Sequence, residues 1–399
     1  MGALRRPGSL ERRHLPGTHG MMARRVPISR LLPFIAVTLA FSCSTTTATP
    51  AADSGCQMTE VPGSSTDRDV LSGVAALEEG ALAIGSRWLG SVGGPLAAVA
   101  TRSGWTPRVI HARGVHSVEM DDVSTDGAGA WAVGAWGNQH PVALRWNGRT
   151  WIPTKVEDPG PGEDGLSGVA TVSSDWVWAV GRHQVGSDFR TLVERWDGRT
   201  WRAVPSPNEG SSAMLKDIEA TGPDDAWAVG WSVKEQRYRT LAQHWDGVAW
   251  RVVPTPTVDG GGDALFAGVA AISPNDVWAV GWTGLRDDLH PLVERWDGQK
   301  WSVVSLPSDV GPGAFLGVAA TPDRLVMVGR SLVDGSLEPL AVLKSGGSWE
   351  KASLVAGQIA DGPAWFTGVA VDPSGSIWAV GSRFPGGGKA VSFAATGCV

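Results

Sequence analysis

The sequence predicts an all-β fold, a seven-bladed β-propeller with four-stranded antiparallel blades, on three observations. A short apolar motif ending in glycine, seen most clearly at residues 177–181 (VWAVG), recurs seven times. A period of about 50 residues is typical of propellers and solenoids. Glycine (53) and proline (26) are abundant, as many short strands joined by turns require. The glycines that end the copies are 47 to 52 residues apart: Gly85, Gly134, Gly181, Gly230, Gly281, Gly329 and Gly381.

One repeat contains four β-prone runs, at residues 168–172, 177–181, 191–196 and 201–204. The second run is apolar on both faces, which favours a sheet packed between two other sheets. Radially stacked blades provide this burial. Asp197 and Gly198 stand between the third and fourth runs, and an Asp-Gly pair predicts a two-residue hairpin turn. The pair or an Asn-Gly equivalent recurs at residues 147–148, 246–247 and 297–298.

The seventh repeat has only three runs, at residues 368–371, 377–381 and 390–396. Residues 57–62 (QMTEVP) align with residues 200–205 (TWRAVP), so an N-terminal strand should complete the last blade. This alignment brings Cys56 and Cys398 together at the seam, and disulfides persist in exported proteins. We therefore expect one propeller domain over residues 56–399, closed by a disulfide.

Residues 1–43 are predicted to be an export signal, with Met21 or Met22 as the working start. Arg24, Arg25 and Arg30 precede an apolar run at residues 31–41, which is the order of charge and apolar residues in such signals. The run is too short to remain as a membrane-spanning helix. Residues 44–55 (STTTATPAADSG) are polar and predict a flexible tether.

Residues 39–43 (LAFSC) resemble the lipobox of bacterial lipoproteins, although Phe41 is an imperfect match. The resemblance implies a lipid on Cys43 and anchoring to the cell membrane through it. The alternative is a plainly secreted product, cleaved nearby. We expect no other membrane attachment.

The repeat resembles the kelch-type propeller repeat in its apolar strand ending in glycine, the run Arg195-Trp196-Asp197-Gly198, and Trp201 followed by Val204-Pro205. It departs from that family in having one glycine where two are usual and tryptophan where tyrosine is usual. It is more similar to the Trp-rich propeller repeats of exported actinobacterial proteins. The Trp-Asp pair is shared with WD40 repeats, but their Gly-His element is missing.

The net charge of the predicted propeller disfavours polyanionic partners. After residue 55 the chain has 27 basic and 38 acidic residues, a net charge of −11. A body this acidic has no electrostatic reason to bind nucleic acid or an anionic lipid surface. We expect a monomer with an extracytoplasmic protein or glycan as its partner.

Fifteen of the 21 tryptophans fall at repeat positions and are predicted to pack between blades. The long loops between second and third strands, such as residues 182–190 and 231–239, should share one face with the connections between blades. Functional residues are expected on this long-loop face. Five tryptophans there are candidates to bind a ligand, or to seal neighbouring loops: Trp88, Trp136, Trp231, Trp282 and Trp365.

A ring of mostly apolar residues is expected to border the central channel: Leu71, Met120, Leu166, Leu215, Phe266, Phe315 and Phe366. Two repeats carry Asp122 and Asp217 in place of the first-strand glycine, with Asp121 and Lys216 beside them. They predict either a polar spot for a cation or ligand near the axis, or solvated and paired charges.

Catalytic patterns are weak. His111 and His116 with Glu119 could meet as a metal or acid–base set, but no pair of histidines has metal-helix spacing and no nucleophile elbow is present. Tyr238 is the only tyrosine, which excludes a copper-radical oxidase of the galactose oxidase type. We expect no metal and no cofactor.

These observations favour an exported, surface-exposed binding or scaffold module for a protein or a cell-envelope glycan. The alternative is an extracytoplasmic enzyme that acts on a carbohydrate or natural product at the channel mouth. A structural role in envelope assembly is a third possibility.

Overall fold

The computed structural model describes residues 57–61, 68–89, 92–101, 103–110, 117–137, 140–258, 262–285, 288–352, 362–386 and 390–396. The predicted export signal and tether lie outside these residues, as do Cys43, Cys56, Cys398, His111 and His116. The described residues form strands and turns, with no helix among them. Within them, therefore, no helix is available that could cross a membrane.

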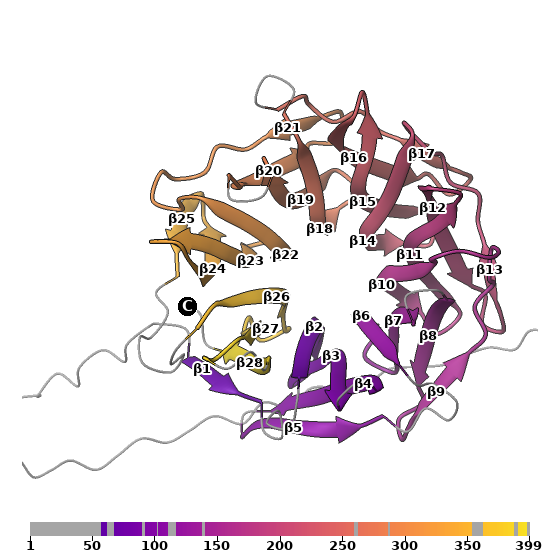
Figure 1. Cartoon of the computed structure of the whole chain (residues 1–399), viewed down its shortest axis with the longest axis horizontal. Helices are drawn as coiled ribbons and strands as arrows, with labels where there is room; N and C mark the ends of the chain where they lie inside the picture. The colour runs from indigo at the N-terminus through magenta and orange to yellow at the C-terminus, as the bar shows by residue number, and fades with distance from the viewer. Residues whose placement is uncertain are drawn as a thin grey trace, which may run out of the picture. The chain divides into compact units, whose positions relative to one another are not determined.

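Seven antiparallel sheets of four strands surround a central axis, which confirms the predicted fold (Figure 1). Blade 1 has β2 (Arg68–Leu77), β3 (Gly80–Leu89), β4 (Val92–Thr101) and β5 (Gly104–Val109). Blade 2 has β6 (Val118–Thr125), β7 (Ala130–Trp136), β8 (His140–Trp146) and β9 (Trp151–Thr154). Blade 3 has β10 (Gly165–Ser173), β11 (Trp176–Val185), β12 (Asp188–Trp196) and β13 (Trp201–Ala203).

The later blades repeat this order from the axis outwards. Blade 4 has β14 (Ser212–Gly222), β15 (Asp225–Lys234), β16 (Arg237–Trp245) and β17 (Trp250–Val252). Blade 5 has β18 (Ala264–Ser273), β19 (Asp276–Thr283), β20 (His290–Trp296) and β21 (Trp301–Val303). Blade 6 has β22 (Gly313–Thr321), β23 (Arg324–Val333), β24 (Ser336–Ser345) and β25 (Ser348–Lys351). Blade 7 has β26 (Ala364–Val371), β27 (Ile377–Arg383) and β28 (Val391–Thr396), and its outer strand is β1 (Gln57–Glu60).

The ring is closed by the pairing of β1 with β28, as predicted. Gln57 lies opposite Thr396 and Glu60 opposite Phe393. The alignment behind the prediction is shifted by two residues, because Thr396 corresponds to Arg195, whose partner is Arg202 and not Thr200. No turn joins β28 to β1, so turn residues could not reveal this register.

The turn between the third and fourth strands differs from the prediction. Trp196 pairs with Trp201, so four residues lie between the strands instead of two. Gly198 has the expected positive φ of 91°. The Asp197 carboxylate accepts hydrogen bonds from the N–H groups of Thr200 (2.9 Å) and Arg199 (3.0 Å). These two donors lower the pKa of Asp197 to about 2 and close a wider turn than the sequence suggested.

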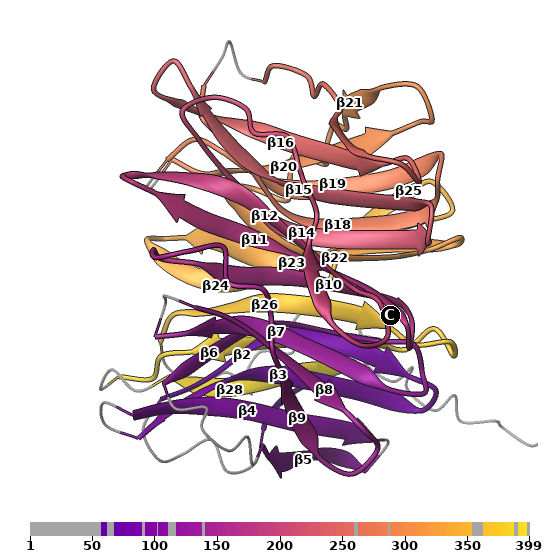
Figure 2. The same ribbon diagram turned by 90° about the vertical axis from the view of Figure 1, so that its right-hand side faces the viewer.

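Tryptophans join consecutive blades. Trp178 of β11 is fully buried, and its ring centroid lies 5.1 Å from that of Trp245 and 5.4 Å from that of Trp250, both in blade 4. Equivalent groups join blades 2 and 3 and blades 4 and 5: Trp131 with Trp196 and Trp201, and Trp227 with Trp296 and Trp301. The neighbouring sheets lie face to face in the side view (Figure 2), so the second strands are buried on both faces as predicted.

Most of the stretches predicted as long loops are strand. In blade 3, β11 and β12 continue until Val185 pairs with Asp188. In blade 4, β15 and β16 continue to the pair Lys234 and Arg237. Polar residues alternate along these extensions, so the apolar pattern that revealed the inner part of each strand stops before the hairpin does. Blade 5 retains a longer loop between Thr283 and His290.

Candidate functional site

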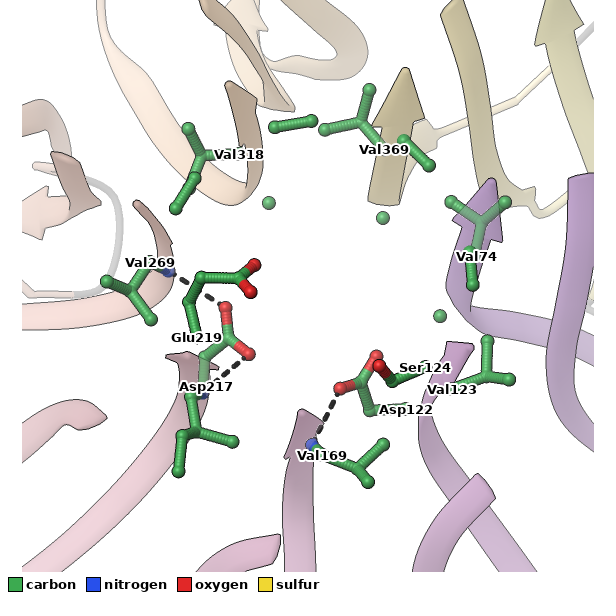
Figure 3. Close-up of a pocket in the computed structure, with 18 of the residues that line it drawn as sticks. Val74, Asp122, Val123, Ser124, Val169, Asp217, Glu219, Val269, Val318 and Val369 are labelled. Carbon is green, nitrogen blue, oxygen red and sulfur yellow. Dashed lines mark hydrogen bonds between the residues drawn. The ribbon is translucent and has the colours of Figure 1, made fainter. Parts of the chain in front are cut away.

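A channel of about 670 Å³ runs along the axis and is lined by the inner strands of all seven blades (Figure 3). Each blade contributes residues from the middle and end of its first strand. Two other cavities, of about 360 and 320 Å³, are smaller, and the channel brings together polar side chains from several blades. We therefore treat the channel as the candidate functional site.

Every inner strand has a β-bulge at the same place. In blade 1 the register shifts between Leu71 and Gly73, and in blade 2 between Met120 and Asp122. A bulge leaves one residue outside the ladder and turns its side chain towards a new direction. The seven bulged residues all line the channel: Ser72, Asp121, Ser167, Lys216, Ala267, Leu316 and Thr367.

This bulge ring corrects the predicted border of the channel. The expected residues, Leu71, Met120, Leu166, Leu215, Phe266, Phe315 and Phe366, are buried between blades and none of them lines the channel. The bulge is the physical reason, because it places the residue before it in the inter-blade core and the bulged residue itself on the axis. The true border lies one residue further along each strand.

The bulge ring has a polar and an apolar side. Asp121 of blade 2 and Lys216 of blade 4 belong to the polar side. The charge of Lys216 lowers the pKa of Asp121, against the larger raising effect of burial. Ala267 and Leu316 of blades 5 and 6 form the apolar side, where Trp282 also lines the channel. A ligand in this channel meets both kinds of surface.

Asp122 and Asp217 connect neighbouring blades. Asp122 accepts a hydrogen bond of 2.9 Å from the Val169 N–H of blade 3. Asp217 accepts one of 2.8 Å from the Val269 N–H of blade 5 and another of 2.8 Å from the Ile218 N–H. Both side chains lie along the wall of the channel (Figure 3). They therefore have a structural role, and their predicted role in ligand binding stays a prediction.

The channel raises the pKa values of its acids. Burial raises the pKa of Asp217 to about 6, and burial followed by the charge of Asp217 holds the pKa of Asp122 well above its usual range. Asp121 remains open to the channel, yet protein surrounds it on its other sides and raises its pKa to about 6. Glu219, two residues after Asp217, has its pKa raised to about 7 by burial and then by the charge of Asp217.

Glu219 and Ser124 were not predicted, although the sequence carries a sign of both. They stand two residues after Asp217 and Asp122, where the other five blades have alanine: Ala75, Ala170, Ala270, Ala319 and Ala370. Ser124 accepts a 3.0 Å hydrogen bond from the Thr171 N–H of blade 3. A comparison of this single position across the repeats would have found the two exceptions.

The five candidate tryptophans do not gather. Trp282 alone lines the channel. The others contact local partners. Trp88 lies under the Arg68 guanidinium at 4.8 Å and Trp136 lies tilted against His140 at 5.5 Å. Trp231 meets Tyr238 edge-on at 5.1 Å, and Trp365 stacks on Phe384 at 5.1 Å. Trp136 is 47% exposed, the only tryptophan among the large exposed apolar residues of the described chain.

The histidines in the described ranges each pair with an aspartate of their own region. The pairs are His140–Asp158 (3.0 Å), His183–Asp164 (2.9 Å), His244–Asp225 (2.7 Å) and His290–Asp288 (3.1 Å). Glu119 is exposed on β6, and its proposed partners His111 and His116 lie outside the described residues. Where the chain is described, no three His, Cys, Asp or Glu side chains gather as a metal site requires.

No protein-family model matches the sequence. No curated protein matches it either. Two solved structures are similar in fold. YCF48 bound to D1 peptide has a TM-score of 0.54 and 14% identity, over 85% of this chain and 96% of that one. A protein of unknown function from Dyadobacter fermentans has a TM-score of 0.51 and 12% identity, over 86% of this chain and 98% of that one. At this identity the likeness shows a shared fold, on which each chain carries its own site.

Proposed function

We propose that this protein is an exported, surface-exposed binding or scaffold module that holds a segment of a partner protein at the channel mouth, on its long-loop face. The observation that carries the proposal is the bulge ring, which surrounds a channel of about 670 Å³ with polar residues on one side and apolar residues on the other. A peptide segment presents both kinds of group, and such concave, mixed surfaces are usual at binding sites.

Charge indicates which segment fits. The described residues that line the channel include four carboxylates, on Asp121, Asp122, Asp217 and Glu219, and one ammonium group, on Lys216. A basic side chain of the partner would pair with Asp121 or Glu219, which are free of the inter-blade hydrogen bonds that occupy Asp122 and Asp217. The peptide in the YCF48 structure supports a protein partner, because it shows that a similar fold accommodates one.

A pull-down from cell envelope tests this proposal. The soluble body, residues 56–399, is compared with a channel variant (Asp121→Ala, Lys216→Ala) and with the aromatic variant (Trp231→Ala, Trp282→Ala). We expect the channel variant to lose the partner. Equal recovery of the partner by all three proteins would reject a role in binding for both the channel residues and the aromatic residues. Recovery of glycan alone would favour the cell-envelope glycan as the ligand.

A second function is favoured by one specific observation. Two carboxyl groups that line the channel have raised pKa values, about 6 for Asp121 and about 7 for Glu219. Acids shifted in this way are typical of catalytic sites, and a pair of carboxyl groups is the usual machinery of glycoside hydrolysis. An extracytoplasmic enzyme acting on carbohydrate is therefore the alternative. Release of reducing ends from envelope polysaccharide, abolished by Glu219→Gln, would establish it; no release by the wild type would exclude it for these substrates.

Export and anchoring are proposed on the sequence alone, from the basic residues and apolar run before Cys43. Mass spectrometry of the mature N-terminus tests them. A lipidated Cys43, with release of the Cys43→Ser variant into the medium, is the expected result. An unprocessed chain retained in the cytoplasm would contradict both.

A further inference from the structure

Glu194, Gln243 and Glu294 occupy one equivalent position in three consecutive blades. Each lies in the middle of its third strand, β12, β16 or β20, opposite an alanine of the second strand. All three side chains are fully buried at 0% exposure. The other four blades have Ala98, Leu144, Val342 and Ala395 at this position.

Gln243, in the middle blade of the three, shows which hydrogen bond a side chain at this position can make. The Gln243 side-chain N–H donates a 2.8 Å hydrogen bond to the carbonyl of Pro207, in the connection that leads into its own blade. Pro256 is the counterpart of Pro207 in the next connection, six residues after the outer-strand tryptophan in both cases. The two connections are alike in structure, since Thr191 contacts Ser206 and Thr240 contacts Thr255 at the same distance of 2.7 Å.

The two glutamates lack the partners that a carboxylate needs. Neither oxygen of Glu194 and neither oxygen of Glu294 accepts a hydrogen bond within the described residues. They lie on the faces that bury Leu192 and Leu292 against the preceding blade. A buried carboxylate without a donor or a cation is strongly disfavoured, and such a group stays protonated instead.

Charged groups near these positions are few. Glu157, the counterpart of Pro207 in the connection before blade 3, is the charged residue that acts on Glu194. The cavity that contains Pro256, between blades 4 and 5, also contains Glu209, Lys234 and Arg239. Lys234 pairs with Glu209 at 2.5 Å, and Arg239 donates to the Gly262 carbonyl at 2.7 Å. These cations are thus engaged elsewhere.

We propose that Glu194 and Glu294 are held as neutral carboxylic acids between blades, where they act like Gln243 and make the ring tighter at acid than at alkaline pH. The Glu294 O–H donates to the connection carbonyl of Pro256, as the Gln243 amide does to Pro207. Loss of the proton removes this donor and leaves a charge in an apolar interface. The blades 2–3 and 4–5 interfaces then loosen, whereas the blades 3–4 interface, which carries glutamine, does not respond.

The direction of the pH effect follows from the titration of the two acids. Burial raises the pKa of Glu294 to about 8, and burial followed by the charge of Glu157 raises that of Glu194 to about 8. In the unfolded chain both return to the ordinary value of about 4.3. The stability that these acids contribute is fully present below that value and is lost as the pH rises through about 8.

Thermal unfolding of the full chain from about pH 5 to about pH 9 tests the proposal. Three proteins are compared: the wild type, the double variant Glu194→Gln/Glu294→Gln, and the reciprocal variant Gln243→Glu. We expect the double variant to match the wild type at the acid end and to unfold several degrees higher at the alkaline end. Gln243→Glu should show the opposite change, with an added loss of stability at alkaline pH only.

Infrared spectroscopy supplies a second measurement that does not depend on stability. Buried neutral carboxylic acids give a C=O stretch distinct from that of carboxylates, and this band should be present in the wild type at neutral pH and smaller in the double variant. A carboxylate band at neutral pH that the double variant loses would overturn the proposal. Equal pH profiles for the three proteins in thermal unfolding would also overturn it.

Discussion

The Asp122 carboxylate of blade 2 accepts a hydrogen bond of 2.9 Å from the Val169 N–H of blade 3. Asp217 makes the same contact to Val269, two blades further on, between blades 4 and 5. At the equivalent position of blade 3, Gly168 lies against the Asp217 backbone of blade 4, where an added Cβ would be only 2.8 Å from the Asp217 Cα. The inner strands of the ring are thus joined in two ways, by direct backbone approach at glycines and by carboxylates that bridge the gap.

Replacement of Asp122 by glycine tests the bridging role. The variant leaves the Val169 N–H without its acceptor, and an unpaired backbone donor costs about 1–3 kcal/mol when water cannot replace the bond. We expect a loss of about 1 kcal/mol in the free energy of unfolding, measured in urea, because channel water compensates in part. Asp121→Ala is the matched control and should cause no loss. An equal loss in both variants would mean that the channel charges, and not the inter-blade bond, set the stability.

Glu219→Ala tests whether the ionised Glu219 side chain destabilises the folded protein. The pKa of Glu219 is raised to about 7, so its carboxylate form is disfavoured in the folded protein. The stability that it contributes is present at acid pH and is lost as the pH rises through about 7. The alanine variant, which restores the residue found in five other blades, should be more stable than the wild type at about pH 8 and gain little at about pH 4. A variant that is less stable at the higher pH would contradict this account.

Trp178→Ala should be the more damaging of two tryptophan truncations. Trp178 is fully buried against Trp245 and Trp250, and loss of such a side chain costs about 3–5 kcal/mol through lost burial and a cavity. Trp136, which is 47% exposed, serves as the control, and its truncation should change stability by no more than about 0.5 kcal/mol. Denaturant unfolding compares the two. Similar losses would show that inter-blade tryptophans do not hold the ring together.

We predict a disulfide between Cys56 and Cys398, where the pairing of β1 with β28 closes the ring. The described ladder ends with Gln57 opposite Thr396, next to Cys56 and two residues before Cys398. A bond between these cysteines would close nearly the whole ring into one loop, with a contribution of roughly 5 kcal/mol on the chain-entropy estimate. Mass spectrometry without reduction should find the two peptides linked. Alkylation of Cys56 in the unreduced protein would reject the bond while leaving the strand pairing intact.

The repeat pattern predicted the blade count, the strand order and the closure of the ring, because each copy carries the same apolar strand and the same trailing tryptophan. The repeat pattern did not predict the channel border, because a β-bulge changes the direction of one side chain in each inner strand. The β-bulge before Gly73 and its equivalents is a local backbone feature without a composition of its own, so Leu71 was placed on the axis and Ser72 was overlooked. Partners across blades, such as Asp122 and Val169, depend on which inner strands approach and cannot be inferred from spacing.

Site-specific photo-crosslinking tests the central claim, that a partner segment enters the channel. A photoreactive residue replaces Ala267 of the bulge ring in one protein, and in another it replaces Val248, which is 80% exposed in the turn between β16 and β17. Both proteins are irradiated with cell envelope, and the linked peptides are identified by mass spectrometry. The account predicts one recurring partner peptide linked at position 267 and absent at position 248. Linkage only at position 248, while the partner is still recovered, would contradict it.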